Sequence, residues 1–202
     1  MYTVLIVVET QVFLLSGVRT PIASFRGSFS TISATELAAT AARAAIERSG
    51  AKTTLCFKIP CCETRSGINP EEIEESFVGC VLTANCGQNV ARQVALSVGI
   101  PNSSQAVTVN KVCSSSMKAL AFAHMSIKCG YRKKVLVAGC ENMSQVPFYL
   151  ERNEIPYGGT TVKDGLVRDG LEDPTLKQPM GLCAEKSAKM SFGLEISYLF
   201  YS

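Results

Sequence analysis

The segment from residue 106 to residue 120 reads AVTVNKVCSSSMKAL. Its first four residues are apolar or β-branched, which is typical of a short buried strand. Apolar residues then recur at helical spacing through residues 117–125, and Gly130 has the character of the left-handed residue that often follows a helix. The pattern therefore predicts that Cys113 lies at a turn from a strand into a helix.

A cysteine at such a turn has two interpretations. Unpaired N–H groups and the positive end of the helix dipole favour a thiolate there, and the thiolate is the nucleophilic form of cysteine. Free cysteine is also one of the residue types most often buried as a small core filler. Local chemistry leaves both open, and we interpret Cys113 as a nucleophile.

The segment 110–120, Asn-x-x-Cys-Ser-Ser-Ser-Met-x-Ala-Leu, resembles the active-site segment of the thiolases, the acetyl-CoA C-acetyltransferase family. Two further segments occur in the family's order: Val-Arg-Thr-Pro-Ile at 18–22, and Gly-Cys-Glu-Asn-Met-Ser at 139–144. The resemblance covers residues 12–192. It implies that Cys113 carries the acyl group as a thioester.

The resemblance also implies a substrate path and points to several departures. Met180 and Gly181 match a family segment that lines the path of the pantetheine arm of coenzyme A. Pro179 stands where relatives usually carry histidine, and Ser116 and Cys140 stand where relatives usually carry glycine. Coenzyme A thioesters are the implied substrates, and no permanently bound cofactor is expected.

The chain pattern predicts an α/β fold. Strands alternate with helices, which favours right-handed crossovers and a mostly parallel sheet with helices on both faces. The same architecture, with an incomplete loop domain, is what the resemblance implies for the N-terminal half of a thiolase. The predicted strands are Val12–Leu15, Phe77–Leu82, Ala106–Val109 and Lys134–Gly139, and the predicted helices include one opened by the capping box at Ser33–Glu36.

Comparison with the family pattern divides the chain into four parts. Residues 1–10 are expected to be a divergent N-terminal extension, and residues 11–143 an α/β domain. Residues 51–67 in that domain have no period, and deleting them restores the family's spacing, which indicates an insertion. Residues 144–193 resemble part of the thiolase loop domain, and residues 194–202 are a divergent tail.

Composition excludes several classes of protein. The formal net charge of the 202 residues is +3 without a long basic run, which gives no support for nucleic-acid binding. The apolar start is too short and interrupted to span a membrane and lacks targeting features. Nine cysteines, without paired C-x-x-C spacing, favour reduced thiols and no metal site. We expect an intracellular protein, cytoplasmic or mitochondrial, with the mitochondrion favoured by the resemblance.

Turnover by a thiolase needs a base, a second cysteine and an oxyanion hole. The family segments that supply them, Asn-Glu-Ala-Phe, Gly-His-Pro and Cys-x-Gly, do not occur in this sequence. The sole histidine, His124, follows Cys113 by eleven positions, which is about 16 Å along a helix at a rise of about 1.5 Å per residue. We therefore interpret His124 as a packing residue.

The expected family activity is acyl transfer between coenzyme A thioesters: two acetyl-CoA give acetoacetyl-CoA and coenzyme A, and the reverse. The chain by itself is expected to be inactive. The resemblance implies dimers or tetramers, so self-association is expected. Two alternatives remain open: a non-catalytic thiolase-like subunit or interaction protein, and a relative of the β-ketoacyl synthases.

Overall fold

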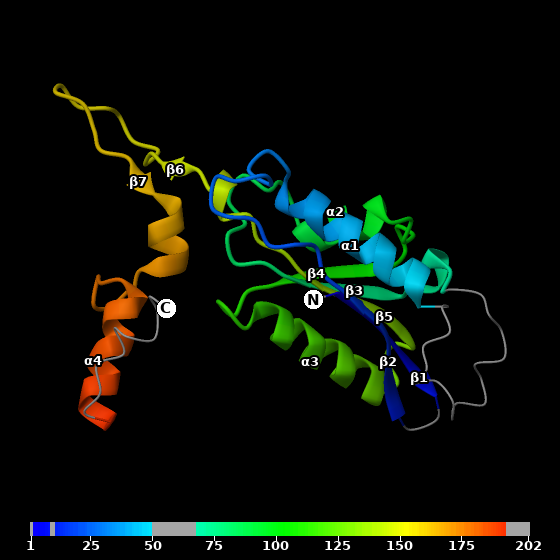
Figure 1. Ribbon diagram of the computed structural model, residues 1–202. Helices are drawn as coiled ribbons and strands as arrows, with labels where there is room; N and C mark the ends of the chain where they lie inside the picture. Colours follow the sequence, from blue (N-terminus) through cyan, green and yellow to red (C-terminus); the bar gives the residue numbers. More distant parts are fainter. Residues whose placement is uncertain (1, 9–10, 50–67, 193–202) are drawn as a thin grey trace. The chain divides into compact units, whose positions relative to one another are not determined.

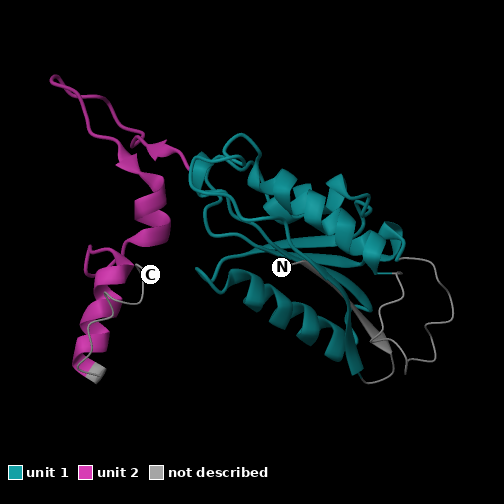
Figure 2. Ribbon diagram, in the orientation of Figure 1, with its two compact units in different colours: residues 1–145 teal, residues 146–202 magenta. Residues whose placement is uncertain are grey.

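The computed structural model describes residues 2–8, 11–49 and 68–192. The chain forms two compact units, residues 1–145 and residues 146–202 (Figure 2). The predicted insertion at 51–67 and the predicted tail at 194–202 lie outside the described residues.

A five-stranded sheet forms the centre of the first unit. Its strand order is β2-β1-β5-β3-β4. Strand β3 pairs in parallel with both β4 and β5, whereas β1 is antiparallel to β2 and to β5. The predicted mostly parallel sheet is therefore confirmed, with one antiparallel strand supplied by the segment that we expected to be an extension. The strands are β1 (Tyr2–Val8), β2 (Gln11–Val18), β3 (Glu75–Gly79), β4 (Gln105–Val109) and β5 (Lys134–Gly139).

Helices cover both faces of this sheet, as predicted. Helices α1 (Ala34–Arg48) and α2 (Val90–Ser97) lie on one face, and α3 (Ser115–Lys128) lies on the other (Figure 1). Each interface between sheet and helices has its own hydrophobic cluster. Two short 3-10 helices, η2 (Pro70–Glu72) and η3 (Met143–Gln145), belong to the connections.

Helix α1 begins where the capping box predicts. The Ser33 side chain accepts a hydrogen bond from the Glu36 backbone N–H at 3.1 Å, which satisfies one unpaired donor of the first turn. The buried face of the helix is built almost entirely of alanine, and such small side chains let the helix approach the sheet closely. The buried residues are Ala34, Ala38, Ala39, Ala41, Ala42, Ala45 and Ile46.

Two strands that we predicted to be buried are edge strands, so that prediction is wrong for them. Strand β2 forms one edge of the sheet and β4 the other. Leu14 is 51% exposed and Val107 is 42% exposed. The local pattern of apolar residues did not distinguish them from β3, whose five residues are all buried because it is paired on both sides and covered on both faces.

Strand β3 ends three residues before the predicted boundary at Leu82. Beyond Gly79 the backbone N–H groups of Val81 and Leu82 donate to the carboxylate of Glu141, at 3.0 and 2.8 Å. Glu141 follows the neighbouring strand β5. These bonds to a side chain end the β-ladder and tie the ends of β3 and β5 together.

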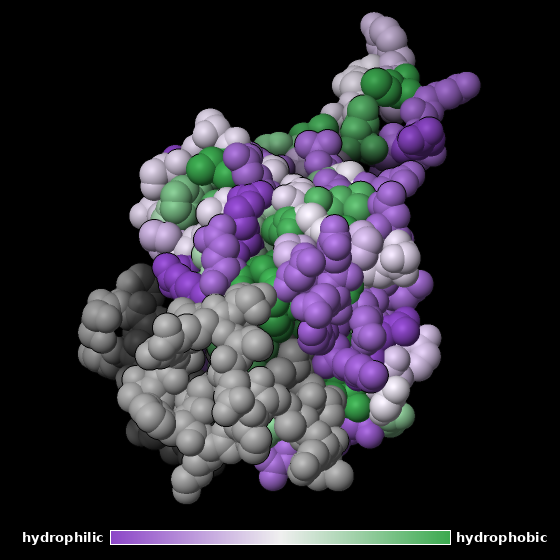
Figure 3. Space-filling model, turned by 90° about the vertical axis from the view of Figure 1, so that its right-hand side faces the viewer, coloured by the Kyte–Doolittle hydropathy of each residue, from purple (hydrophilic) through white to green (hydrophobic). Residues whose placement is uncertain are grey.

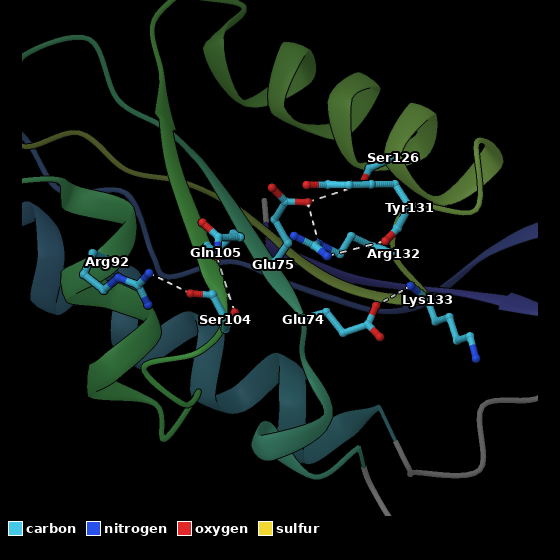
Figure 4. Close-up of polar contacts among 9 residues, drawn as sticks. All are labelled: Glu74, Glu75, Arg92, Ser104, Gln105, Ser126, Tyr131, Arg132 and Lys133. Atoms are coloured by element: carbon cyan, nitrogen blue, oxygen red, sulfur yellow. Dashed lines mark hydrogen bonds and ion pairs between the residues drawn. The ribbon is translucent and has the colours of Figure 1, made fainter.

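A polar network holds the opposite end of the sheet (Figure 4). The Glu75 carboxylate, with its side chain 8% exposed, accepts from Arg132 Nε at 3.3 Å and from the Ser126 hydroxyl at 3.2 Å. Glu74 accepts from the Lys133 backbone N–H at 2.5 Å. Figure 3 views the molecule from this side, and much of the surface not drawn in grey is hydrophilic. The network fixes the end of α3 against the start of β3.

The second unit has a small sheet and two helices. Strands β6 (Phe148–Tyr149) and β7 (Lys163–Asp164) pair antiparallel, followed by the π-helix η4 (Val167–Leu171) and by α4 (Met180–Phe192). The Tyr149 hydroxyl donates to Asp169 at 2.5 Å, and this bond is the main reason that the pKa of Tyr149 is raised to about 12.

Candidate functional site

Cys113 lies in the connection between β4 and α3, two residues before the helix begins. This is the strand-to-helix turn that the sequence pattern predicts. The Cys113 side chain is exposed. The exposure contradicts the alternative that Cys113 is a core filler, and it leaves the thiol open to a reactant.

Hydrogen bonds among the neighbours of Cys113 fix the turn. The Ser115 hydroxyl donates to the Val112 carbonyl at 2.5 Å and accepts from the Lys111 N–H at 2.9 Å. The Ser114 hydroxyl donates to the Lys111 carbonyl at 3.0 Å, and the Asn110 side-chain oxygen accepts from the Val112 N–H at 3.0 Å. The serines and asparagine of the motif thus hold the backbone around the cysteine.

The residue before the cysteine has an unusual backbone. Val112 has a φ of +47°, in the left-handed region that a β-branched residue rarely adopts. Such conformations store strain and cluster at functional sites. Sequence reasoning missed this signal, because valine is not a residue type that indicates a left-handed conformation.

Two glycines make room for the turn. Gly79 of β3 and Gly139 of β5 are paired side by side in the sheet. A Cβ on Gly79 would lie 2.4 Å from the Ser116 backbone nitrogen, and a Cβ on Gly139 would lie 2.6 Å from the Ser116 Cβ. The turn therefore rests directly on the ends of the two central strands. We did not single out either glycine from the sequence.

The two ends of α3 differ in their polar surroundings. Ser114 stands at the N-cap, and its side chain makes no capping hydrogen bond. At the other end Gly130, with a φ of +71°, and the residue after it donate to the carbonyls of Ile127 and Ser126, both at 2.9 Å. This closed C-terminus confirms the predicted helix end. Cys129 is the C-cap residue and is also exposed.

The Gly-Cys-Glu-Asn-Met-Ser motif after β5 braces the loops around this end of the sheet. The Asn142 side-chain amide donates to the carbonyls of Phe29 and Ile32, at 2.9 and 2.6 Å. The Ser144 hydroxyl accepts from the Arg26 N–H at 2.8 Å. Together with the bonds of Glu141, these contacts give the motif a structural role.

The cysteines at the ends of β3 and β5 differ from Cys113. Cys80 and Cys140 are both buried, and the Cys80 thiol donates to Glu141 at 3.6 Å. A hydrogen bond shared with Cys140, followed by burial, raises the pKa of the Cys80 thiol far above its usual range. Burial also raises the pKa of Cys86. Raised pKa values disfavour the reactive thiolate, which favours a packing role over a nucleophilic one for Cys80 and Cys86.

A cavity of about 370 Å³ lies between α2 and the ends of β3 and β4. Asn110 lines it and also holds the Val112 N–H, but Cys113 does not line it. The lining residues are Cys80, Thr83, Gly87, Asn89, Val90, Thr108 and Asn110.

The other candidate residues lie on helices α4 and α3. Met180 and Gly181 begin α4 in the second unit, whereas Cys113 belongs to the first. Met180 is 45% exposed, and Gly181 has open space where a Cβ would lie. His124 is exposed on α3, so its interpretation as a packing residue is wrong.

Residues 2–8, 11–49 and 68–192 contain neither a cluster of metal-ligating side chains nor a membrane-spanning helix. Side chains that could hold a metal ion do not gather there in groups of three or more. In the same part of the chain, every helix is too short or too polar to cross a membrane.

Comparison with known proteins gives one family. The profile described as "Thiolase, N-terminal domain" matches residues 12–192. The mitochondrial acetyl-CoA acetyltransferase of Danio rerio is 42% identical over 181 residues, which are 90% of this chain and 39% of the relative. The acetyl-CoA acetyltransferase of Schizosaccharomyces pombe is 41% identical over 184 residues, covering 90% of this chain and 42% of the relative.

A solved structure agrees with these relatives. The crystal structure of a thiolase from Ascaris suum in complex with coenzyme A has a TM-score of 0.76 and 46% identity, and the match covers 93% of this chain and 43% of that one. The chain thus spans about two fifths of the length of the proteins it matches. The matched range confirms the resemblance expected over residues 12–192. The chain belongs to the thiolase family and corresponds to its N-terminal domain.

Proposed function

We propose that Cys113 accepts an acyl group from a coenzyme A thioester, as the first step of thiolase-type acyl transfer. The observation that carries the proposal is the exposed thiol on a turn fixed by hydrogen bonds, next to a left-handed valine and at the start of α3. The relatives named acetyl-CoA acetyltransferase favour acetyl-CoA as the donor. The complete thiolase reaction would convert two acetyl-CoA into acetoacetyl-CoA and coenzyme A, and would also run in reverse.

The acylation step needs no cofactor, because its bonds and protons are all accounted for by the thiol and the thioester. The Cys113 thiolate attacks the carbonyl carbon of the thioester and forms a new S–C bond. The bond between that carbon and the coenzyme A sulfur breaks. The proton lost by Cys113 is matched by the proton that free coenzyme A takes up from solvent. The positive end of α3 stabilises the attacking thiolate.

We propose that the 202-residue chain stops at this acyl-enzyme. The next step requires a base and a second acid–base thiol close to the acyl group. His124 follows Ser115, the first residue of α3, by nine positions, which is about 13 Å along the helix axis and far outside a hydrogen-bonding distance of about 3 Å from the turn that carries Cys113. Acetoacetyl-CoA formation by this chain alone is therefore expected to be absent.

The experiment is to incubate the chain with acetyl-CoA and to measure the intact mass and the modified peptide. A gain of one acetyl group per chain, located on Cys113 and removed by hydroxylamine, supports the proposal. Cys113→Ser should abolish the gain, whereas Cys129→Ser, at the other end of the same helix, should retain it. No acetylation, or equal acetylation of Cys113 and Cys129, would reject the acyl-transfer proposal and favour a non-catalytic thiolase-like subunit.

We propose that Met180 and Gly181 contact the pantetheine arm of coenzyme A. The support is the resemblance of their segment, the exposure of Met180 and the open space at Gly181. Gly181→Val should weaken acetylation of Cys113 at low acetyl-CoA concentration without changing its labelling by iodoacetamide. A variant that loses both would point to a general folding defect.

We propose that the chain self-associates, as a dimer or tetramer. The outer side of α3 carries Met117 at 72% and Met125 at 46% exposure, and contiguous exposed apolar surface favours association. The second unit adds a larger set of exposed apolar side chains. They are Phe148, Leu150, Ile155, Tyr157, Val162, Val167, Leu171, Leu176, Met180, Leu182 and Met190. A monomer in light scattering at micromolar concentration would contradict the proposal.

We also propose that the protein is located in the mitochondrion. Several relatives, including those of Danio rerio and Homo sapiens, are mitochondrial by name. Imaging of the tagged chain against a mitochondrial marker tests this location against a cytoplasmic one.

A further inference from the structure

Strand β1 occupies an internal position in the sheet. It pairs with β2 along its whole length, from Tyr2 opposite Val18 to Val8 opposite Gln11. Residues 3–6 also pair with residues 134–137 of β5. Along residues 3–6 the backbone therefore has a strand on each side, both antiparallel to it.

The position of β1 contrasts with the extent of the family match. The profile match begins at residue 12, after β1 has ended. Within the described sheet, β2 is hydrogen-bonded to β1 alone, and β5 is bonded to β1 and β3. Removing β1 would therefore leave β2 without any strand partner and leave one edge of β5 open. Unpaired strand edges bind other strands readily.

The sequence of β1 suits it to fill such a gap. Residues 2–8 read YTVLIVV, with five β-branched residues and no charge, glycine or proline. Segments of this composition have high β-propensity and associate strongly when they are free. Pairing on both sides satisfies the backbone N–H and C=O groups that would otherwise bond to strands of other molecules.

We propose that the gap between β2 and β5 is a strand-acceptor site and that residues 2–8 occupy it as an intramolecular donor strand. The site recognises an extended apolar peptide that runs antiparallel to both neighbours. Main-chain hydrogen bonds supply the affinity, as in other cases of strand addition. The donor is the chain's own N-terminal segment, which lies outside the part that matches the family.

The first test is hydrogen exchange on the unmodified chain with single-residue resolution. In a strand paired on both sides, successive N–H groups point to alternate neighbours. Every amide of residues 3–6 should therefore be protected. If residues 2–8 formed only a hairpin with β2, every second amide would exchange at a nearly free rate. That alternating result would overturn the proposal.

The second test uses proline, which removes a backbone donor. Leu5 pairs with Leu14 and Val135, whereas Val8 pairs only with Gln11 near the end of the hairpin. Leu5→Pro should speed exchange of those amides in residues 134–137 that bond to β1 by about tenfold or more, while β3, β4 and the β5 amides that bond to β3 stay protected. The control Val8→Pro should leave residues 134–137 protected. Unchanged exchange in Leu5→Pro would reject the acceptor site.

The third test restores the strand in trans. A synthetic peptide with residues 2–8 between added lysines should bind the Leu5→Pro chain and return protection to residues 134–137. A scrambled peptide of the same composition should not. Equal restoration by both peptides would show non-specific association and overturn the proposal. Loss of protection in every strand of Leu5→Pro would mean that the variant does not fold. The exchange pattern of residues 3–6 in the unmodified chain would then accept or reject the proposal.

Discussion

Gly79 and Ser116 are in closer contact than any side chain at residue 79 would allow. A Cβ on Gly79 would lie 2.4 Å from the Ser116 backbone nitrogen and 2.7 Å from its Cα. These are backbone atoms, which cannot move aside without moving the start of α3. The position of the candidate nucleophile thus depends on a residue in another strand that has no chemistry of its own.

The two glycines under the turn should respond differently to alanine. At Gly139 the added Cβ would meet only the Ser116 side chain, at 2.6 and 2.8 Å, whereas at Gly79 it would meet backbone. Each single substitution should cost about 1–3 kcal/mol of unfolding free energy. Ser116→Gly should recover about 1 kcal/mol or more in Gly139→Ala and little in Gly79→Ala.

Chemical denaturation of the four variants and of Ser116→Gly alone measures this difference. Labelling of Cys113 should follow stability, because the glycines act by placing the turn. Equal recovery of both glycine variants by Ser116→Gly would contradict the backbone contact at Gly79.

Cys113 and Cys129 offer a comparison within one helix. Both are exposed, one before the first turn of α3 and the other at its C-cap. The helix dipole favours a thiolate at the first position and disfavours it at the second, so Cys113 should react with iodoacetamide about tenfold faster near neutral pH. Peptide mapping after limited labelling measures both rates in one sample. Faster reaction at Cys129 would argue against activation by the helix.

Val112 should tolerate glycine better than a valine in an ordinary strand. Its left-handed backbone stores about 1–3 kcal/mol of strain that glycine would relieve. Val112→Gly should therefore leave the unfolding free energy unchanged or raise it. The control is Val107→Gly in β4, where the exposure is similar, at 42% against 45%, and the loss should be about 1 kcal/mol.

The Tyr149–Asp169 hydrogen bond should appear in alkaline titration. The raised pKa of about 12 means that the folded state holds the phenol proton more tightly than the unfolded state, where the pKa is about 10. The stabilisation is complete below about pH 10 and is lost as the pH rises through 12. Phenolate absorbance should contain one late component that Tyr149→Phe removes and Tyr157→Phe retains.

Glu75 and Glu72 should differ in their effect on stability. The Glu75 side chain is 8% exposed and bonds to Arg132 and Ser126, whereas the Glu72 side chain is 50% exposed and pairs with Lys134. Glu75→Ala should cost about 2 kcal/mol because it removes charged hydrogen bonds and leaves the partly buried Arg132 and Ser126 side chains without this acceptor. Glu72→Ala should cost less than about 0.5 kcal/mol, as expected of an exposed ion pair. Thermal denaturation of both variants under one set of conditions compares them.

Local signals in the sequence predicted much of the first unit. The capping box at Ser33, the glycine after α3 and the bounds of β5 are all confirmed, because each depends on neighbouring residues alone. The turn that carries Cys113 follows from the same kind of signal. The family follows from three segments in order, and the profile match confirms it.

Pairing between distant segments could not be predicted in the same way. Residues 2–8 were set apart because they do not resemble the family, although their β-branched composition suits a strand. The edge positions of β2 and β4 depend on strand order, which no local pattern contains. The left-handed Val112 and the need for glycine at residue 79 arise from packing across the sheet.

The placement of β1 has a consequence for synthesis of the chain. Strand β2 follows β1 almost at once, so their hairpin can form as soon as both leave the ribosome. The other partner, residues 134–137 of β5, is made much later. At about 5–20 residues per second, one side of a highly apolar strand waits unpaired for on the order of ten seconds. During this time the nascent chain can pair wrongly with other chains. The risk ends only when β5 pairs with β1.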